Sequence, residues 1–331
     1  MNFIWLPKSP TSSDLRLNFE KGFLSWCIME YLIGVLIFCL VLFFYLHIYF
    51  HLKTSNDLEV YTIERPSKEK LEEICDLRQP VTFQYINKEL CSLLTLDAIN
   101  KNYSAFDLKI RDHKDDPDKT ELYLPLVFGE AFALLKKNEN NNYFTENNGD
   151  FLSETGLLRT FRHNDLFLRP PLVSKCIYDL CAGSKGVTIP LRYNMNYRNY
   201  IYVVEGTISV KLIPPAAGRY LRGEKDYDNF EFRSPMNPWN IQDEYKREFN
   251  KVKSLEVKLQ QGDIVFVPAY WWYSIRYDSP STLCYFNYRT YMNTCAIAPH
   301  IIISWLQAQN IKRDIVEKVS TAPHSSEEIT K

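Results

Sequence analysis

His163 and Asp165 are spaced as H-x-D, a pattern in which an imidazole and a carboxylate can hold one metal ion. They lie well before the strand-rich half of the chain, and no distal His accompanies them in a matching context. We therefore expect the pair to have a surface or loop role. No HExxH motif, phosphate-binding glycine loop or G-x-S-x-G motif occurs, so hydrolase and nucleotide chemistries have no support.

Composition narrows the class of protein further. The eight cysteines form no CxxC pair, which favours reduced, mostly buried thiols over a zinc site or a disulfide framework. Lys and Arg total 39 against 40 Asp and Glu, so no electrostatic reason exists to expect nucleic acid as the main partner. The 22 Tyr and 20 Phe suit a β-rich interior, because aromatic side chains pack well on pleated surfaces.

Two segments carry the other candidate residues. Residues 186–194 read GVTIPLRYN, and residues 262–273 read GDIVFVPAYWWY. In the second segment Gly-Asp turns the chain, an apolar strand follows, and Pro268 ends its hydrogen-bonding ladder. The aromatic pair Trp271 and Trp272 is expected to close the mouth of a barrel.

Both segments resemble motifs of one family. Residues 262–273 resemble the GD-hydrophobic-P-x-x-WWH signature of the cupin-like Jumonji C oxygenases, and residues 186–194 resemble the strand that ends in L-H-x-D. The nearest resemblance is to oxygenases of the factor-inhibiting asparaginyl hydroxylase type. It covers residues 65–312 and implies a double-stranded β-helix, the cupin or jelly-roll barrel, mainly β with flanking helices.

The departures from these motifs fall on the metal ligands. The family holds Fe(II) with two His and one carboxylate, and the matching positions here are Arg192, Asn194 and Tyr273. A guanidinium has no lone pair to give, an amide is a weak ligand, and a phenol must lose a proton of pKa about 10. The resemblance therefore implies a barrel with no metal, no cofactor and no catalytic residue, a pseudoenzyme.

The co-substrate position is altered as well. Family members carry a Lys for 2-oxoglutarate where this chain has Ile208, and Lys211 is expected to face the other way along the strand. The candidate pocket therefore consists of Arg192, Asn194, Tyr273, Ile208 and the Trp271–Trp272 pair. It either binds an acidic or polar ligand or is filled, with Arg192 paired to an internal carboxylate.

Residues 31–50 are a membrane-span candidate. The run has no formal charge, and twenty helical residues cover about 30 Å, the thickness of a bilayer core. A signal peptide has a shorter apolar core nearer the first Met, and a buried soluble helix has a polar face, so a single-pass helix bound to the lipid bilayer is expected. Three basic residues before the run and four after it leave the orientation undecided.

The remaining chain divides into regions of different character. Residues 1–30 are an N-terminal tail, residues 51–64 a linker, and residues 313–331 the end of a C-terminal helix and a disordered tail. The elements expected within the domain are a helix capped by Ser67, a helix over Lys88–Ile99, an Asn-rich surface loop over Asn138–Asn148, hairpins at Glu205-Gly206 and at residues 260–263, and a helix over Ile301–Val319.

These features predict a membrane-anchored, non-catalytic cupin-like protein with a structural, ligand-binding or partner-binding role. The anchored form resembles proteins that large DNA viruses encode, which implies a component of a viral membrane or virion. The alternative is an Fe(II)/2-oxoglutarate-type oxygenase with an unconventional site. A third hypothesis is a homodimer through the apolar stripe of the C-terminal helix.

Overall fold

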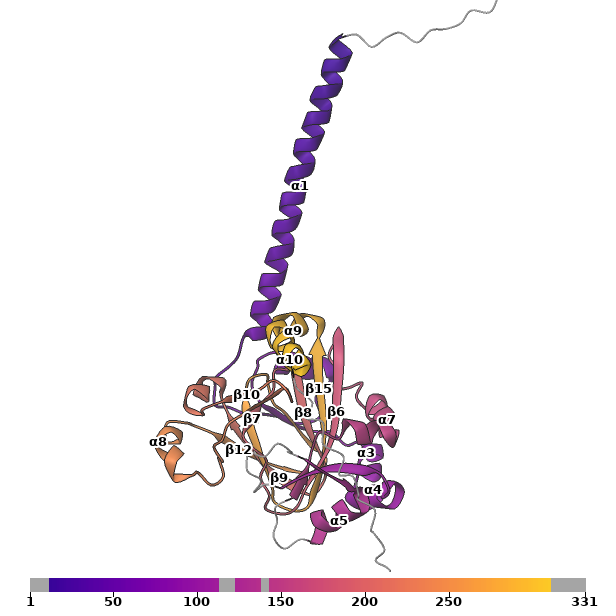
Figure 1. The fold of residues 1–331 in the computed structure, drawn as a ribbon, viewed down its shortest axis with the longest axis vertical. Coiled ribbons are helices and arrows are strands. Elements are labelled where there is room, and N and C mark those ends of the chain that lie inside the picture. Colours follow the sequence, from indigo (N-terminus) through magenta and orange to yellow (C-terminus); the bar gives the residue numbers. More distant parts are fainter. Residues whose placement is uncertain (1–11, 113–122, 138–142, 311–331) are drawn as a thin grey trace, which may run out of the picture.

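The computed structural model describes residues 12–112, 123–137 and 143–310. One long helix, α1 (Ser12–Leu52), projects from a domain built on two β-sheets (Figure 1). The expected fold class, mainly β with flanking helices, is confirmed. Residues 1–11 and 311–331, and with them the expected tails, lie outside the described residues.

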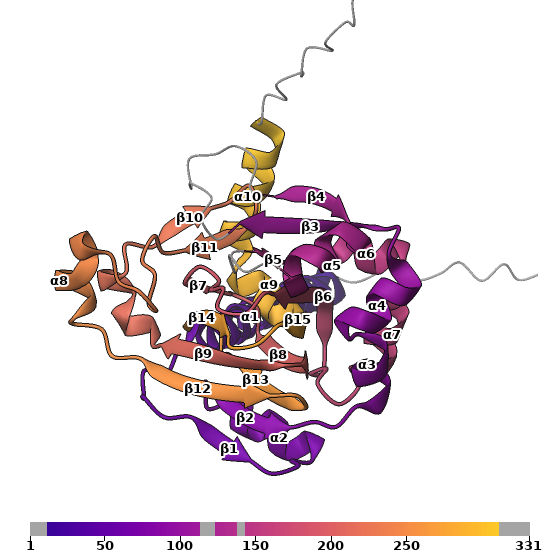
Figure 2. The ribbon, with the colours of Figure 1, turned by 90° about the horizontal axis from the view of Figure 1, so that it is seen from below.

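Two sheets face each other and form the body of the domain (Figure 2). In spatial order, the strands described for the larger sheet are β1 (Tyr61–Ile63), β2 (Val81–Gln84), β13 (Asp263–Phe266), β8 (Arg198–Glu205), β15 (Ser281–Thr290), β6 (Val173–Gly183), β5 (Tyr143–Thr145), β3 (Asp107–Asp112) and β4 (Leu124–Val127). Those of the smaller sheet are β10 (Glu224–Asp226), β11 (Glu231–Arg233), β7 (Arg192–Tyr193), β14 (Trp272–Tyr277), β9 (Thr207–Ile213) and β12 (Leu255–Gln260).

Helices cover the outer face of the larger sheet and one end of the domain. Those on the outer face are α2 (Lys68–Cys75), α3 (Lys88–Leu93), α4 (Leu96–Tyr103), α5 (Phe128–Lys137), α6 (Gly149–Glu154) and α7 (Leu157–Asn164). At the end from which α1 projects lie α9 (Tyr291–Ala296) and α10 (Ala298–Asn310) (Figure 1). The segment between β9 and β12 also holds η1 (Pro215–Tyr220), η2 (Asp243–Tyr245) and α8 (Lys246–Phe249).

The central strands of the larger sheet are buried on both faces. Along β8, Tyr200 and Tyr202 pack against the helices, whereas Ile201 and Val203 lie in the core between the two sheets. Successive side chains of a strand point to opposite faces, so one strand contributes to both cores. This arrangement explains why β8 is apolar at consecutive positions.

Both expected hairpins are wrong, because the two strands that flank each turn belong to different sheets. β8 lies between β13 and β15 in the larger sheet, while β9 lies between β14 and β12 in the smaller one; β12 and β13 are divided in the same way. Gly206 and Gly262 therefore sit at corners between the sheets, with φ values of 85° and 92°. Sequence spacing alone cannot separate a corner from a hairpin, since both need a tight, glycine-bearing turn.

Two expectations about helices have different outcomes. The Ser67 cap is confirmed, since its hydroxyl accepts a hydrogen bond from the Lys70 backbone N–H at 3.2 Å. The single helix over Lys88–Ile99 is wrong: α3 ends at Leu93, and the Thr95 hydroxyl accepts from the Ala98 N–H and begins α4. A threonine cap competes with helix continuation by bonding the backbone itself. The last helix begins at Ala298, and its expected residues beyond 310 lie outside the described part.

The Asn-rich segment is not a surface loop where the structure describes it. Residues 143–145 form β5, and the side chains of Glu146 and Asn148 are buried. The Asn148 amide donates to the Thr145 hydroxyl at 2.6 Å and to the Leu180 carbonyl at 2.8 Å. Polar residues are stable inside when each bond is satisfied, which composition does not reveal. Residues 138–142 lie outside the described part.

Residues Ile28–Leu52 of α1 are long and apolar enough to cross a membrane. Side chains between Tyr31 and Leu46 are exposed, as expected for a helix without a protein partner along that stretch. Near its end the helix meets the domain, where His51 is buried and its Nε2 lies 3.3 Å from the Thr290 hydroxyl.

Candidate functional site

A pocket of about 650 Å³ opens at the mouth of the barrel. Its walls come from β6, β7, β11, β14 and β15, and α10 forms one edge. Arg192, Asn194 and Tyr273, all predicted from the sequence, line it together. They meet because β7 and β14 are neighbours, with Arg192 paired to Tyr273 in the sheet register.

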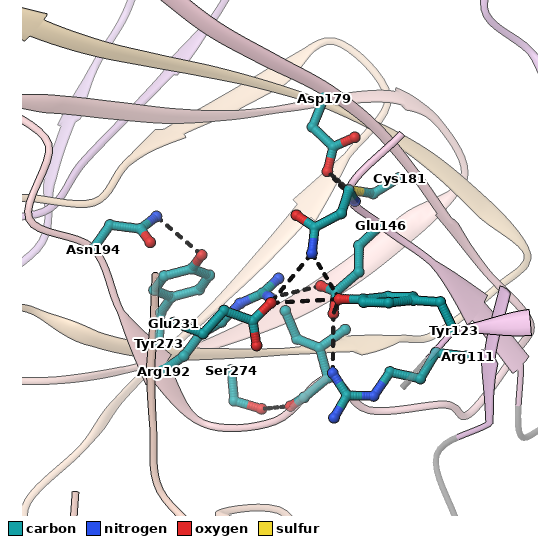
Figure 3. Close-up of polar contacts among 12 residues, drawn as sticks. Arg111, Tyr123, Glu146, Asp179, Cys181, Arg192, Asn194, Glu231, Tyr273 and Ser274 are labelled. Carbon is teal, nitrogen blue, oxygen red and sulfur yellow. Dashed lines mark hydrogen bonds and ion pairs between the residues drawn. The ribbon is translucent and has the colours of Figure 1, made fainter. Parts of the chain in front are cut away.

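Arg192 is held by a buried carboxylate. Its Nη1 lies 2.6 Å from Glu146 Oε2, and Arg111 Nη1 lies 3.3 Å from Glu146 Oε1, so one carboxylate joins two guanidinium groups (Figure 3). Side-chain exposure is 14% for Arg192 and 2% for Glu146. The internal carboxylate that the sequence analysis required for Arg192 is therefore Glu146.

The charges in this group stabilise each other. Burial opposes the ionisation of Glu146, but the guanidinium groups of Arg192 and Arg111 outweigh it and lower its pKa. Burial would likewise lower the pKa of Arg192, and the Glu146 carboxylate raises it instead. Glu146 is thus an anion and Arg192 a fixed cation in the folded protein.

Further polar side chains surround this ion pair (Figure 3). The Tyr123 hydroxyl lies 3.1 Å from Glu146 Oε1 and 3.4 Å from Glu231 Oε1. Asn147 Nδ2 donates to the Tyr123 hydroxyl at 2.6 Å and to Glu231 at 3.2 Å. Burial first, then the charges of Glu146 and Glu231, raise the pKa of Tyr123, so it stays a neutral donor.

Asn194 and Tyr273 are bonded to each other. Asn194 Nδ2 donates to the Tyr273 hydroxyl at 3.2 Å, and the Arg192 guanidinium carbon lies 5.7 Å from the centre of the Tyr273 ring. Burial raises the pKa of Tyr273 despite the nearby Arg192 cation. Tyr273 is therefore a neutral phenol whose oxygen already accepts a hydrogen bond.

Asp179 forms a second polar centre on the pocket wall. Its carboxylate accepts from the backbone N–H groups of Asn147 and Asn148, both at 2.7 Å, and from the Cys181 thiol at 3.3 Å. Burial raises the pKa of Asp179 to about 6, although the two backbone donors act in the opposite direction.

Three residues of the predicted pocket do not line it, and the prediction is wrong for them. Ile208 and Trp271 are fully buried in the core between the sheets, where the Trp271 indole donates to the Arg78 carbonyl at 3.2 Å. Trp272 points to the other face of β14 and packs beside Tyr193, with ring centres 4.7 Å apart. Trp271 and Trp272 belong to different hydrophobic cores, so this aromatic pair does not close one mouth together.

The expectation for Lys211 is confirmed. Its ammonium group lies 4.5 Å from the centre of the Trp239 ring and donates to the Pro238 carbonyl at 2.8 Å. Ile208, Val210 and Leu212 of the same strand belong to the inner core. Lys211 therefore faces away from the barrel interior.

The H-x-D pair is divided by the fold. His163 is exposed at the end of α7, whereas Asp165 is buried and accepts hydrogen bonds from Arg169, Tyr178 and Tyr288. Asp165 thus has a structural role beneath the larger sheet. Among the described residues, no three His, Cys, Asp or Glu side chains lie together as a metal-binding group.

The residues that surround Arg192 were not predicted from the sequence. Glu146 and Asn147 lie in the segment expected to be a surface loop, and Glu231 lies in the segment between β9 and β12. Arg111 and Tyr123 stand among charged residues. The one available signal was that a buried arginine needs a carboxylate. Which carboxylate pairs with Arg192 depends on how the fold brings β5 and β7 together.

Comparison with known families agrees with this architecture. The cupin-like domain family model matches residues 94–294, well over half of the chain. The chain belongs to the cupin-like domain family. No curated protein matches the chain in sequence. Membership in the cupin-like family accounts for the two facing sheets, while the chemistry of this member has to be argued from its own residues.

Proposed function

We propose that this protein is a membrane-anchored, non-catalytic cupin-like module that binds a polar ligand or partner at the barrel mouth. The observation that carries the non-catalytic part is the Arg192–Glu146 ion pair at 2.6 Å, which places a cation at a family ligand position. The pocket of about 650 Å³ beside this pair supports ligand binding over a filled barrel. Helix α1 supplies a single membrane span, and its orientation is left undecided. A viral membrane or virion is one setting for such a protein, on its likeness to the anchored proteins that large DNA viruses encode.

The chemistry of the residues does not fit Fe(II). If the resemblance to asparaginyl hydroxylases holds residue by residue, the metal would meet Arg192, Asn194 and Tyr273. Arg192 is a cation bound to Glu146, and Tyr273 is a neutral phenol that accepts a bond from Asn194. A dication gains nothing from such a set, which favours the pseudoenzyme over the oxygenase alternative.

The co-substrate position supports the same conclusion. Ile208 is fully buried, and its neighbour across β14 is Tyr277, another fully buried side chain. The Tyr277 ring packs directly on Gly183, where an added Cβ would lie 2.5 Å from the ring. A dianion such as 2-oxoglutarate would meet apolar side chains here and no ammonium group from Lys211.

Two unpaired polar atoms support ligand binding. Asn287 Oδ1 and Arg192 Nε are buried beside the pocket and have no hydrogen-bond partner among the described residues. Buried polar atoms are nearly always bonded, so an unpaired acceptor and an unpaired donor beside one pocket support a polar ligand there. Hydroxyl and amide groups can both donate and accept, and the paired charges nearby favour an uncharged ligand.

Metal and turnover measurements test the proposal. The full-length protein in detergent should take up far less than one equivalent of Fe(II) and release no succinate from 2-oxoglutarate. The variant Arg192→His/Asn194→Asp/Tyr273→His restores the family's ligand set and should gain iron. Stoichiometric iron or succinate release in the unmodified protein would overturn the proposal.

A separate measurement tests ligand binding. Native mass spectrometry of the intact protein, released from the membrane, should detect a retained small molecule that the Asn287→Leu variant loses. Serine at position 92, which is exposed and far from the pocket, offers a matched control as Ser92→Ala. Equal occupancy in all three proteins, or none in any, would contradict binding at this pocket.

A further inference from the structure

Exposed apolar side chains gather at the end of the domain from which α1 projects. We call this set the apolar end face; it consists of Leu172, Tyr291, Ile302, Ile303, Trp305 and Leu306. The Tyr291 backbone N–H donates to the Leu172 carbonyl at 3.2 Å, so the chain segments before β6 and at the start of α9 adjoin. Such a group of large apolar side chains in water is costly and marks an interaction surface.

The face is continuous along α10. Ile301, Ser304, Trp305 and Ala308 of this helix line the pocket, and their spacing of three and four residues defines one side of it. Trp305 is also 60% exposed, so it lies at the border between this side and the apolar end face. Ile302, Ile303 and Leu306 fall on the other side and are exposed. From Ala298 to Asn310 the sequence contains no Asp, Glu, Lys or Arg, so no formal charge opposes entry of this side into an apolar medium.

The base of α1 lies beside the same surface. His51 contacts Thr290, the residue that caps α9, and its ring centre lies 5.2 Å from that of Tyr197. The candidate span Ile28–Leu52 has 25 residues, whereas a bilayer core needs about 20. The last turns of α1 pack on the domain, so the residues in excess of a bilayer span are these. The edge of the bilayer would therefore lie level with α9.

The direction of α10 agrees with this placement. In Figure 1 α1 runs up the picture and α10 lies at its foot; in Figure 2 the view is along α1, and α10 extends within the plane of the picture. Helix α10 therefore runs roughly perpendicular to α1. A helix in that direction lies parallel to a membrane that α1 crosses.

We propose that the apolar end face lies in the interfacial layer of the bilayer, with α10 as an interfacial helix. The inference rests on the membrane span of the proposed function and adds a second, independent contact with lipid. Tyr291 and Trp305 would then extend the interfacial aromatic belt that Tyr45 and Tyr49 of α1 begin. The pocket, whose edge is α10, would open next to the membrane surface.

Quenching of tryptophan fluorescence by lipids tests the placement. The full-length protein is reconstituted into phosphatidylcholine vesicles with brominated acyl chains. Trp305→Phe should lose part of the lipid-quenched signal of the unmodified protein. Trp239→Phe is the matched control, because Trp239 lies on the smaller sheet with its indole N–H bonded to Ser274 at 2.9 Å, and its removal should leave that signal unchanged.

The possible outcomes distinguish the membrane span of α1 from the lipid contact of the apolar end face. A protein that stays in the vesicles after an alkaline carbonate wash, yet loses no lipid-quenched signal with Trp305→Phe, retains the span and overturns the interfacial helix. A protein that washes off overturns both. If Trp305 escapes lipid quenching and chemical cross-linking joins copies through α10, the face is the homodimer contact instead, and the lipid proposal fails.

Discussion

At the scale of single residues, the barrel mouth is organised by one carboxylate. Arg192 and Arg111 both reach Glu146, and neither has another carboxylate as close among the described residues. A buried guanidinium without a counter-charge is among the most unfavourable groups a fold can contain. Stability of the domain and the character of the pocket therefore depend on the same side chain.

The Glu146→Gln variant should lower the free energy of unfolding by roughly 3–5 kcal/mol, because two buried cations lose their shared anion. Chemical unfolding of the full-length protein in detergent measures the change. Asp150→Asn is the control, since the Lys109–Asp150 pair is exposed and should contribute less than about 1 kcal/mol. Equal effects of the two substitutions would show that the Glu146 pair is not buried in solution.

Asp179 should make stability depend on pH. Its folded-state pKa of about 6 lies above the ordinary value of 3.8, so the native state holds a proton that the unfolded chain releases. Its contribution is fully present below pH 4 and is lost as the pH rises through 6, by up to roughly 3 kcal/mol.

Unfolding free energies measured from pH 4 to 7 in the unmodified protein and in Asp179→Asn check this expectation. The variant should be less stable, because its amide NH₂ faces a backbone N–H donor, but it should lack the decline between pH 4 and 6. An unchanged pH profile would assign the decline to other groups.

Residue types predicted part of this site. Arg192, Asn194 and Tyr273 were identified as pocket residues because their positions in two motifs are fixed by strand register. Glu146 was missed because its partner lies on a strand distant in sequence, and its own neighbours are polar residues typical of a loop. Pairing across a fold is a tertiary property that local patterns do not contain.

At the scale of elements, the corners at Gly206 and Gly262 divide consecutive strands between the two sheets. Both residues have positive φ, but their surroundings differ. A Cβ at position 206 would lie 2.2 Å from the Ser281 hydroxyl oxygen and 2.6 Å from the Pro280 carbonyl oxygen, whereas nothing lies within 4 Å at position 262. The first corner is thus closed by packing and the second is open.

Gly206→Ala should therefore destabilise the domain more than Gly262→Ala does. The second substitution costs only the backbone strain of an L-residue at positive φ, roughly 1–2 kcal/mol, and the first adds a clash with β15. Thermal unfolding of both variants measures the difference. A smaller loss for Gly206→Ala would mean that the corner can open without disturbing the core.

Some of the strands were predictable from the sequence, and their partners were not. The two expected hairpins placed strands on either side of Gly206 and Gly262, where β8, β9, β12 and β13 lie. The hairpin interpretation failed because a strand apolar on both faces fits equally well beside its sequence neighbour or in the opposite sheet. Whether such a strand pairs with its sequence neighbour or joins the opposite sheet depends on how all strands together fill the two cores.

At the scale of the whole molecule, α1 and the domain are joined by a packed contact. His51 is buried at the junction, and the Arg78 guanidinium carbon lies 4.9 Å from the ring centre of the partly exposed Phe50 and 4.7 Å from that of Tyr197. Two nitrogens of Arg78 have no hydrogen-bond partner among the described residues, so these ring contacts are its main stabilisation.

Phe50→Ala/His51→Ala should loosen this junction. Hydrogen exchange of the full-length protein in lipid nanodiscs should increase in α9 and near Tyr197, while exchange in β8 and β15 stays slow. Lys53→Ala is the control, because Lys53 is exposed directly after α1 and should change little. Unaltered exchange in α9 would show that the contact does not hold the domain.

The position of β15 in the chain has a consequence for biosynthesis. This strand lies between β8 and β6 in the larger sheet, and both partners precede it in sequence. A nascent polypeptide cannot complete either core until β15 has left the ribosome, by which time α1 has long been available to the insertion machinery. Contacts of such long sequence separation form slowly. If α1 inserts into the membrane as proposed, the domain is expected to mature post-translationally while already tethered, with chaperones protecting its open sheet edges.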